Sequence, residues 1–158
     1  MASSRIWIPA FSGTVPNSAT AAASVTVVHG TNWSWPFLSF WGSGGGSSDT
    51  LAYFHATVPD AYSANANFTI RIYWSCATGT VGHNVSWDVG YIGRADDGAM
   101  DTAPTATVTV NDVVLATGDL HIALAAFVAP TLAAGNLIQL SLNRDYDEAD
   151  GGTALTTA

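Results

Sequence analysis

The strongest constraint on the fold of this chain is a two-residue alternation of apolar and polar side chains. It is clearest in the stretch FTIRIYWSC, residues 68–76. The apolar set there is Phe68, Ile70, Ile72, Trp74 and Cys76. Successive side chains of a β-strand point to opposite faces, so this stretch predicts a strand with one buried face.

Four later runs show the same period: VGHNVSWDVGY, ATVTV, HIALAAFV and LIQLSL. In HIALAAFV the alternation places Ile122, Leu124, Ala126 and Val128 on one face. Four earlier runs, RIWIPA, SVTVV, PFLSFW and LAYFHATV, are further strand candidates. Short strands at roughly ten-residue spacing, separated by Gly-, Asp- and Pro-rich turns, are typical of antiparallel sandwiches and barrels.

Composition supports the same fold class. The chain has no lysine, and Glu148 is its only glutamate, so the residues that usually fill exposed helix faces are nearly absent. We therefore expect an all-β, antiparallel, jelly-roll-like β-sandwich with little helix, formed as a single domain by residues 1–158. Residues 1–30 either supply its first strands or form an extended N-terminal arm.

The charge of the chain limits the classes of partner that it can bind. The net charge is −8, and the only basic side chains besides histidine are Arg5, Arg71, Arg94 and Arg144. Four dispersed arginines do not suit nucleic acid or an anionic membrane, so neither partner is expected. Charged residues make up only 10% of the chain, which favours a surface partly covered by other subunits over the alternative, a monomer kept soluble by small polar residues. The N-terminus lacks the pattern of a secretory signal, so synthesis in a cytoplasm is expected.

Residues that could carry catalysis are scattered. The four histidines are isolated singles and Cys76 is the only cysteine, so no cofactor or transition-metal site is predicted. Within GHNVSWD, the alternation turns His83 away from Ser86 and Asp88, which argues against a catalytic triad. Asp88 is the best single acid for a hydrolase, but no partner carboxylate is marked. We expect no enzymatic activity.

The stretch NRDYDEAD, residues 143–150, is the most charged part of the chain. Counting by twos from LIQLSL turns Arg144 toward the core, where a guanidinium needs a carboxylate. We predict a structural ion pair of Arg144 with Asp150, with Asp145 as the neighbouring acid. Calcium bound by Asp145, Asp147 and Asp150 is the weaker alternative. The other acidic turn, RADDGAMD, is a calcium candidate of the same kind.

An aromatic cluster followed by a glycine-serine loop occupies residues 31–50. Its aromatics are either core material or a surface that docks a partner or stacks on sugar rings. The candidates for partner or glycan contact are Trp33, Trp35, Trp41 and, on a later strand, Tyr73.

The succession RIWIPA, FTIRIYWSC, GHNVSWDVGYI and LIQLSLNRDYDEAD resembles small jelly-roll structural proteins of tailed bacteriophages. The resemblance spans most of the chain as a loose pattern. It implies structural roles for Trp74, Arg144, Asp145 and Asp150. Such proteins usually continue into a closing strand after the Arg-Asp turn, whereas here only GGTALTTA follows. Either a neighbouring subunit completes that sheet edge or TALTTA pairs weakly there itself.

The resemblance implies a non-enzymatic virion protein. The expected role is capsid decoration, or cement, by a homotrimer that binds the major capsid protein or another virion protein. Head-fibre and tail locations are also compatible with the resemblance. The alternative function is carbohydrate binding, as a module or as a host-glycan-binding fibre or tail domain.

Overall fold

A computed structural model describes residues 5–15, 24–29, 32, 34–40, 50–76 and 80–145 of the chain. The described part is all-β apart from one short 3-10 turn, η1 (Ala10–Ser12). Its strands are β1 (Ser24–His29), β2 (Ser34–Ser39), β3 (Thr50–Thr57), β4 (Phe68–Trp74), β5 (Asn84–Arg94), β6 (Ala106–Val113), β7 (His121–Phe127) and β8 (Leu137–Asp145). None of the described segments forms a helix long and apolar enough to cross a membrane.

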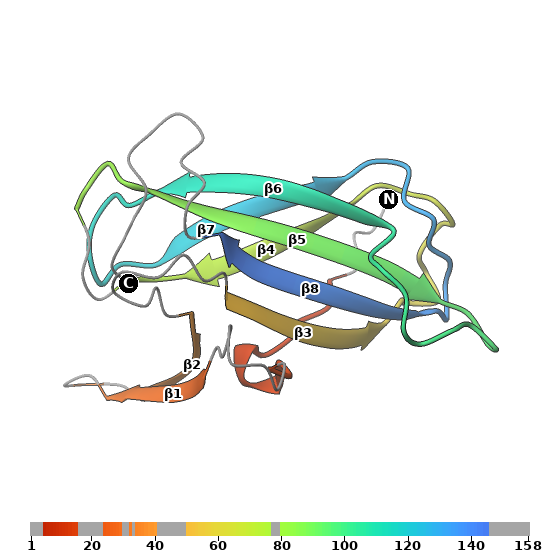
Figure 1. Cartoon of the computed structure of the whole chain (residues 1–158), viewed down its shortest axis with the longest axis horizontal. Coiled ribbons are helices and arrows are strands. Elements are labelled where there is room, and N and C mark those ends of the chain that lie inside the picture. The colour runs from red at the N-terminus through yellow and green to blue at the C-terminus, as the bar shows by residue number, and fades with distance from the viewer. Residues whose placement is uncertain are drawn as a thin grey trace.

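The strands form three antiparallel sheets. One has four strands in the order β3-β8-β5-β6, and a second pairs β4 with β7. The chain crosses between these two sheets repeatedly, so the pairs β3–β8, β5–β8 and β4–β7 join strands that are distant in sequence, whereas β5 and β6 are consecutive. The third sheet is the hairpin β1–β2, which lies below the others in Figure 1.

The first two sheets pack face to face as a β-sandwich (Figure 1). Aromatic rings fill the space between them. Phe68 of β4 meets Tyr91 of β5 at 5.2 Å between ring centroids, and Trp74 of β4 meets Trp87 of β5 at 6.3 Å. Such ring pairs stabilise a core beyond the area they bury. The predicted all-β sandwich is confirmed.

The predicted phase of β4 is also confirmed, because Ile72, Trp74 and Cys76 are buried while Thr69, Arg71 and Tyr73 are exposed. In VGHNVSWDVGY, Val81 departs from the predicted face because it lies in the turn before β5 and is exposed. The segments near Pro59 and Thr131 form non-helical turns.

The face of β7 that contacts the core was not the one suggested by its apolar residues. Ile122, Leu124, Ala126 and Val128 do share a face, but it is exposed. The opposite residues are buried, because Phe127 stacks on Phe68 at 4.8 Å and His121 stacks on Trp74 at 4.5 Å. Both parities of β7 are largely apolar, so its aromatic partners on β4 decide the phase.

RIWIPA forms no strand, which corrects one of the nine strand predictions. Residues 5–15 instead run across one side of the sandwich, and we call them the N-terminal strap. Thr14 forms a two-way backbone bridge with Tyr53 of β3, at 2.8 and 2.9 Å. Trp7 stacks on Tyr73 of β4 at 5.7 Å. The strap therefore contacts both sheets, and residues 24–29 form strand β1.

Candidate binding surfaces

The most unusual surface in the described part of the chain is the outer face of β4–β7, which we define as Thr69, Arg71, Tyr73, Ile122, Leu124 and Ala126. Tyr73 lies opposite Ile122 in the register, and Arg71 lies opposite Leu124. The exposed fractions are 43% for Tyr73, 44% for Ile122 and 53% for Leu124. Large apolar side chains that adjoin one another on a surface mark an interaction site more often than isolated ones do.

A second group of exposed apolar residues, the end patch, lies around the turn before β5 and the β6–β7 connection. Its members are Val81, Val113, Leu115 and Leu120. Backbone bonds join the two segments, since Gly82 donates to Val114 and Val114 donates to His83, both at 2.9 Å. These bonds hold Val81 close to the start of the β6–β7 connection.

Tyr73 is the predicted contact residue that the structure places on such a surface. Its ring stacks on Trp7 of the strap, with 26° between the ring planes, and both side chains remain largely exposed. The backbone of Trp35 lies in β2, opposite Val28. The side chain of Trp35, and all of Trp33 and Trp41, lie outside the described residues.

Arg144 points into the protein, as its sequence phase predicted. It is 3% exposed and lies opposite Thr50 and Trp87 in the register. Its guanidinium donates to the carbonyl of Phe40 at 3.3 Å, which attaches the residue after β2 to the sandwich. The ring of Phe40 also meets Trp87 edge-on at 5.2 Å.

The structure describes only one of the carboxylates that were predicted to lie near Arg144. Asp150 and Asp147 lie outside the described residues, so the clamp and its calcium alternative both stay predictions. Asp145, at the end of β8, is half-buried. Within the described residues, no three acidic, histidine or cysteine side chains are grouped as metal ligands, the RADDGAMD turn included.

Asp88 is hydrogen-bonded within the outer face of the four-stranded sheet. It accepts from the Thr109 hydroxyl at 2.5 Å and from the Asn143 amide at 3.5 Å. These cross-strand contacts give the carboxylate a structural role.

Trp74, one of the residues named by the phage-protein resemblance, also has a structural hydrogen bond. Its indole N–H donates to Asp112 of β6 at 2.8 Å. The bond ties β4 in one sheet to β6 in the other, so it crosses the sandwich and satisfies the polar atom of a buried tryptophan.

Arg94 is a structural residue that the sequence analysis did not single out. It is 7% exposed, and its Nε donates to Gln139 of β8 at 2.9 Å. Its terminal nitrogens donate to the hydroxyl and carbonyl of Thr102 and, at 3.0 Å, to the carbonyl of Met100. Arg94 therefore holds the loop after β5 against the sheet. Even spacing from Asp88 on β5 would have placed it on that outer face.

Comparison of the chain with protein-family models, with curated proteins and with solved structures found no match.

Proposed function

We propose that this protein is a non-enzymatic structural subunit of a virus particle, which assembles as a homotrimer and decorates the particle surface. The particle context rests on the sequence resemblance to jelly-roll structural proteins of tailed bacteriophages. The assembly rests on one structural observation, the exposed apolar outer face of β4–β7. A capsid subunit or another virion protein is the partner of the assembled trimer.

The outer face of β4–β7 has a composition suited to subunit contact. Aromatic and aliphatic side chains are enriched at the centre of protein interfaces, and arginine is the charged residue most often found there. Tyr73, Ile122 and Leu124 supply the apolar contact, and Arg71 adds a cation beside them. On a chain of net charge −8, that arginine is complementary to the acidic surface of another copy.

The presence of two apolar surfaces favours a trimer over a twofold dimer. A twofold interface joins one patch to the same patch of the other subunit, whereas a closed ring joins two different patches. The outer face of β4–β7 and the end patch are two such surfaces, and Leu120 and Ile122 connect them along the start of β7.

Light scattering on the purified chain, followed by cosedimentation with empty capsids, tests this proposal. We expect the mass of a trimer and saturable binding to the particles. A chain that stays monomeric at high concentration and does not sediment with capsids would contradict both parts of the proposal.

Glycan binding is a second candidate, favoured by the exposed stack of Trp7 and Tyr73. Exposed aromatic rings offer apolar faces on which sugar rings can pack. A glycan array and a tryptophan-fluorescence titration distinguish the two functions. A sugar-dependent shift that disappears in Trp7→Ala would favour a glycan-binding domain, whereas a silent array supports the decoration role.

A further inference from the structure

The two long sides of the sandwich are closed differently. On one side β6 of the four-stranded sheet lies beside β7 of the other sheet (Figure 1). On the other side β3 and β4 are the edge strands, and they have no ladder with each other. The N-terminal strap crosses that open side, bound to β3 through Thr14 and to β4 through Trp7.

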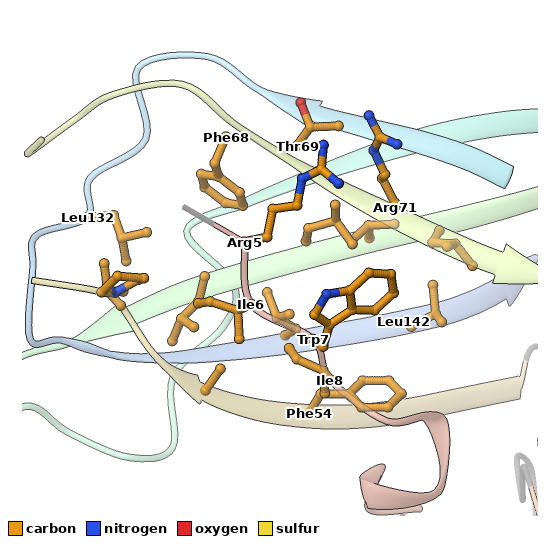
Figure 2. A pocket seen from close by; sticks show the side chains of 18 of the residues that line it. Arg5, Ile6, Trp7, Ile8, Phe54, Phe68, Thr69, Arg71, Leu132 and Leu142 are labelled. Atoms are coloured by element: carbon orange, nitrogen blue, oxygen red, sulfur yellow. The ribbon is translucent and has the colours of Figure 1, made fainter. Parts of the chain in front are cut away.

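A pocket of about 540 Å³ lies under the strap. This volume falls in the range of roughly 300–1,000 Å³ that is typical of small-molecule sites. Its wall is mainly apolar and comes from the strap and from both sheets. Representative lining residues are Ile6, Ile8, Phe54, Phe68, Leu132 and Leu142, which Figure 2 shows around the cavity.

Both exposed arginines of the chain line this same pocket. Arg94 and Arg144 are buried, which leaves Arg5 and Arg71 as the exposed ones. Figure 2 shows both guanidinium groups projecting on the β4 side of the cavity. Within the described part of the chain, neither Arg5 nor Arg71 makes a hydrogen bond or an ion pair.

We propose that this pocket binds a linear aliphatic carboxylate, with its hydrocarbon tail between the sheets and its carboxylate at Arg5 and Arg71. The apolar wall suits a tail without polar atoms, because burial of such a tail needs no hydrogen bonds. A guanidinium matches a carboxylate in shape and can donate two parallel hydrogen bonds to it. Arg5 and Arg71 both line the pocket, so a bound anion would be attracted by two positive charges and would reduce the repulsion between them.

Charge decides the class of ligand. The chain carries a net charge of −8, so its overall field repels anions and attracts cations. Screening limits that field to about 8 Å at physiological salt, and the two arginines dominate within this distance. An amphiphile of the same tail with a neutral or cationic head lacks this local attraction. The site goes beyond the proposed assembly role, and it shares Arg71 with the face proposed for subunit contact.

Calorimetric titration with dodecanoate, dodecanol and dodecylammonium, below their micelle concentrations, tests this assignment. The three probes share one tail and differ only in the head group. We expect saturable binding of one dodecanoate per chain, with dodecanol and dodecylammonium at least about tenfold weaker. Absence of saturation, or equal affinity for dodecanoate and dodecylammonium, would overturn the proposal.

Two sets of variants test where the carboxylate head and the hydrocarbon tail of dodecanoate bind. Arg5→Gln with Arg71→Gln should weaken dodecanoate binding by at least about tenfold, whereas Arg5→Lys with Arg71→Lys should keep most of it. Ala56→Phe should block the tail, because Ala56 lines the pocket from β3. Circular dichroism confirms that each variant is folded, and Ile70→Phe replaces Ala56→Phe if that variant unfolds. Unchanged dodecanoate affinity in a folded pocket-filling variant would place the site elsewhere.

Light scattering on the same samples separates this proposal from the proposed function. Loss of dodecanoate binding with an unchanged mass of the protein oligomer would affect the pocket assignment and leave the proposed assembly standing. A monomeric chain that still binds dodecanoate would contradict the assembly and leave the pocket assignment standing.

Discussion

The two outer faces of the sandwich follow the same alternation but use their side chains differently. On the four-stranded sheet, polar residues of adjacent strands bond to each other, as in the series His55, Gln139 and Arg94, with contacts of 3.2 and 2.9 Å. On β4–β7 the corresponding positions hold Tyr73, Ile122 and Leu124, which remain exposed. The polar groups of the first face bond within a single chain, although Tyr53 and Val113 are also exposed there, and the β4–β7 face has the composition of a surface that another molecule covers.

A covering loop adds to this difference. Arg94 holds Met100 and Thr102 in place, and Pro104 then lies over Gly90 of β5. Over β4–β7, Trp7 of the strap stacks on Tyr73, but Ile122 and Leu124 remain exposed. The contrast gives predictions in which matched changes on the two faces have different outcomes.

The largest expected effect comes from removing one arginine from each face. Arg94→Ala should lower the free energy of unfolding by about 3 kcal/mol, because Gln139, Thr102 and Met100 lose the buried donor that they share and the loop loses its anchor. Arg71→Ala should change it by no more than about 0.5 kcal/mol, because the side chain is exposed and has no hydrogen bond to a described residue. Urea denaturation of both variants measures the difference. Equal losses would show that the two faces do not differ in this way.

The next largest effect concerns assembly. Ile122→Asp with Leu124→Asp should weaken self-association by at least about tenfold, because each buries a charge in the proposed interface. Asn111→Asp with Thr107→Asp, at exposed positions on the outer face of β6, is the matched control and should leave the mass unchanged. Sedimentation velocity over a concentration series measures the self-association of both variants. A trimer that survives the first pair would place the interface elsewhere.

Sequence patterns predicted the fold class and the phase of some strands, and the reasons differ from strand to strand. In β4, Ile72 and Trp74 alternate with Arg71 and Tyr73, so one phase is clearly more apolar. In β7 both phases are apolar, and only the rings of neighbouring strands determine that Phe127 is buried. Periodicity within one segment carries no information about such neighbours.

The candidate sites likewise divide into features that local sequence predicts and features that depend on tertiary contacts. Arg144 could be placed inward by counting along β8. Counting along β5 also places Arg94 correctly, on the outer face of its sheet. The acidic turn after β5 looks like a solvated loop in the sequence, so its attachment to Arg94 could not be predicted. RIWIPA has the alternation of a strand, yet the strap that contains it pairs with β3 only at Thr14, next to Gly13, where a Cβ atom would meet Phe54 at 2.8 Å. The pocket depends on this tertiary placement, so no local pattern could predict it.

A smaller effect tests whether the loop truly covers one face. Gly90→Ala should cost about 1–2 kcal/mol, because the new Cβ would lie 2.4 Å from the Ser141 hydroxyl and 3.1 Å from Pro104. Ala126→Val adds volume on the open face of β7 and should stay within about 0.5 kcal/mol of the parent. Thermal melts at low protein concentration compare the two. A neutral Gly90→Ala would mean that the loop yields easily and that this face is also open.

The smallest expected effect concerns the interior between the two sheets. It is a loss of stability against unfolding at alkaline pH. Burial raises the pKa of Tyr62 above its ordinary value of 10.0, with the charge of Tyr91 adding to the rise. Burial likewise raises the pKa of the Cys76 thiol above 9.0, although its own backbone and Arg144 oppose the shift. Both groups thus stay neutral in the folded chain at a pH where the unfolded chain begins to ionise. Their contribution to stability is complete below about pH 9 and is lost as the pH rises toward the folded values.

Urea midpoints measured from pH 7 to pH 11 should therefore fall on the alkaline side. The fall should be smaller in Tyr62→Phe and in Cys76→Ala, because each variant lacks one of the ionising groups. Tyr53→Phe is the control, since Tyr53 is an exposed tyrosine on the outer face of the four-stranded sheet. A parent-like alkaline slope in both interior variants, with a reduced slope in the control, would assign the response to the polar outer face and remove the interior as its source.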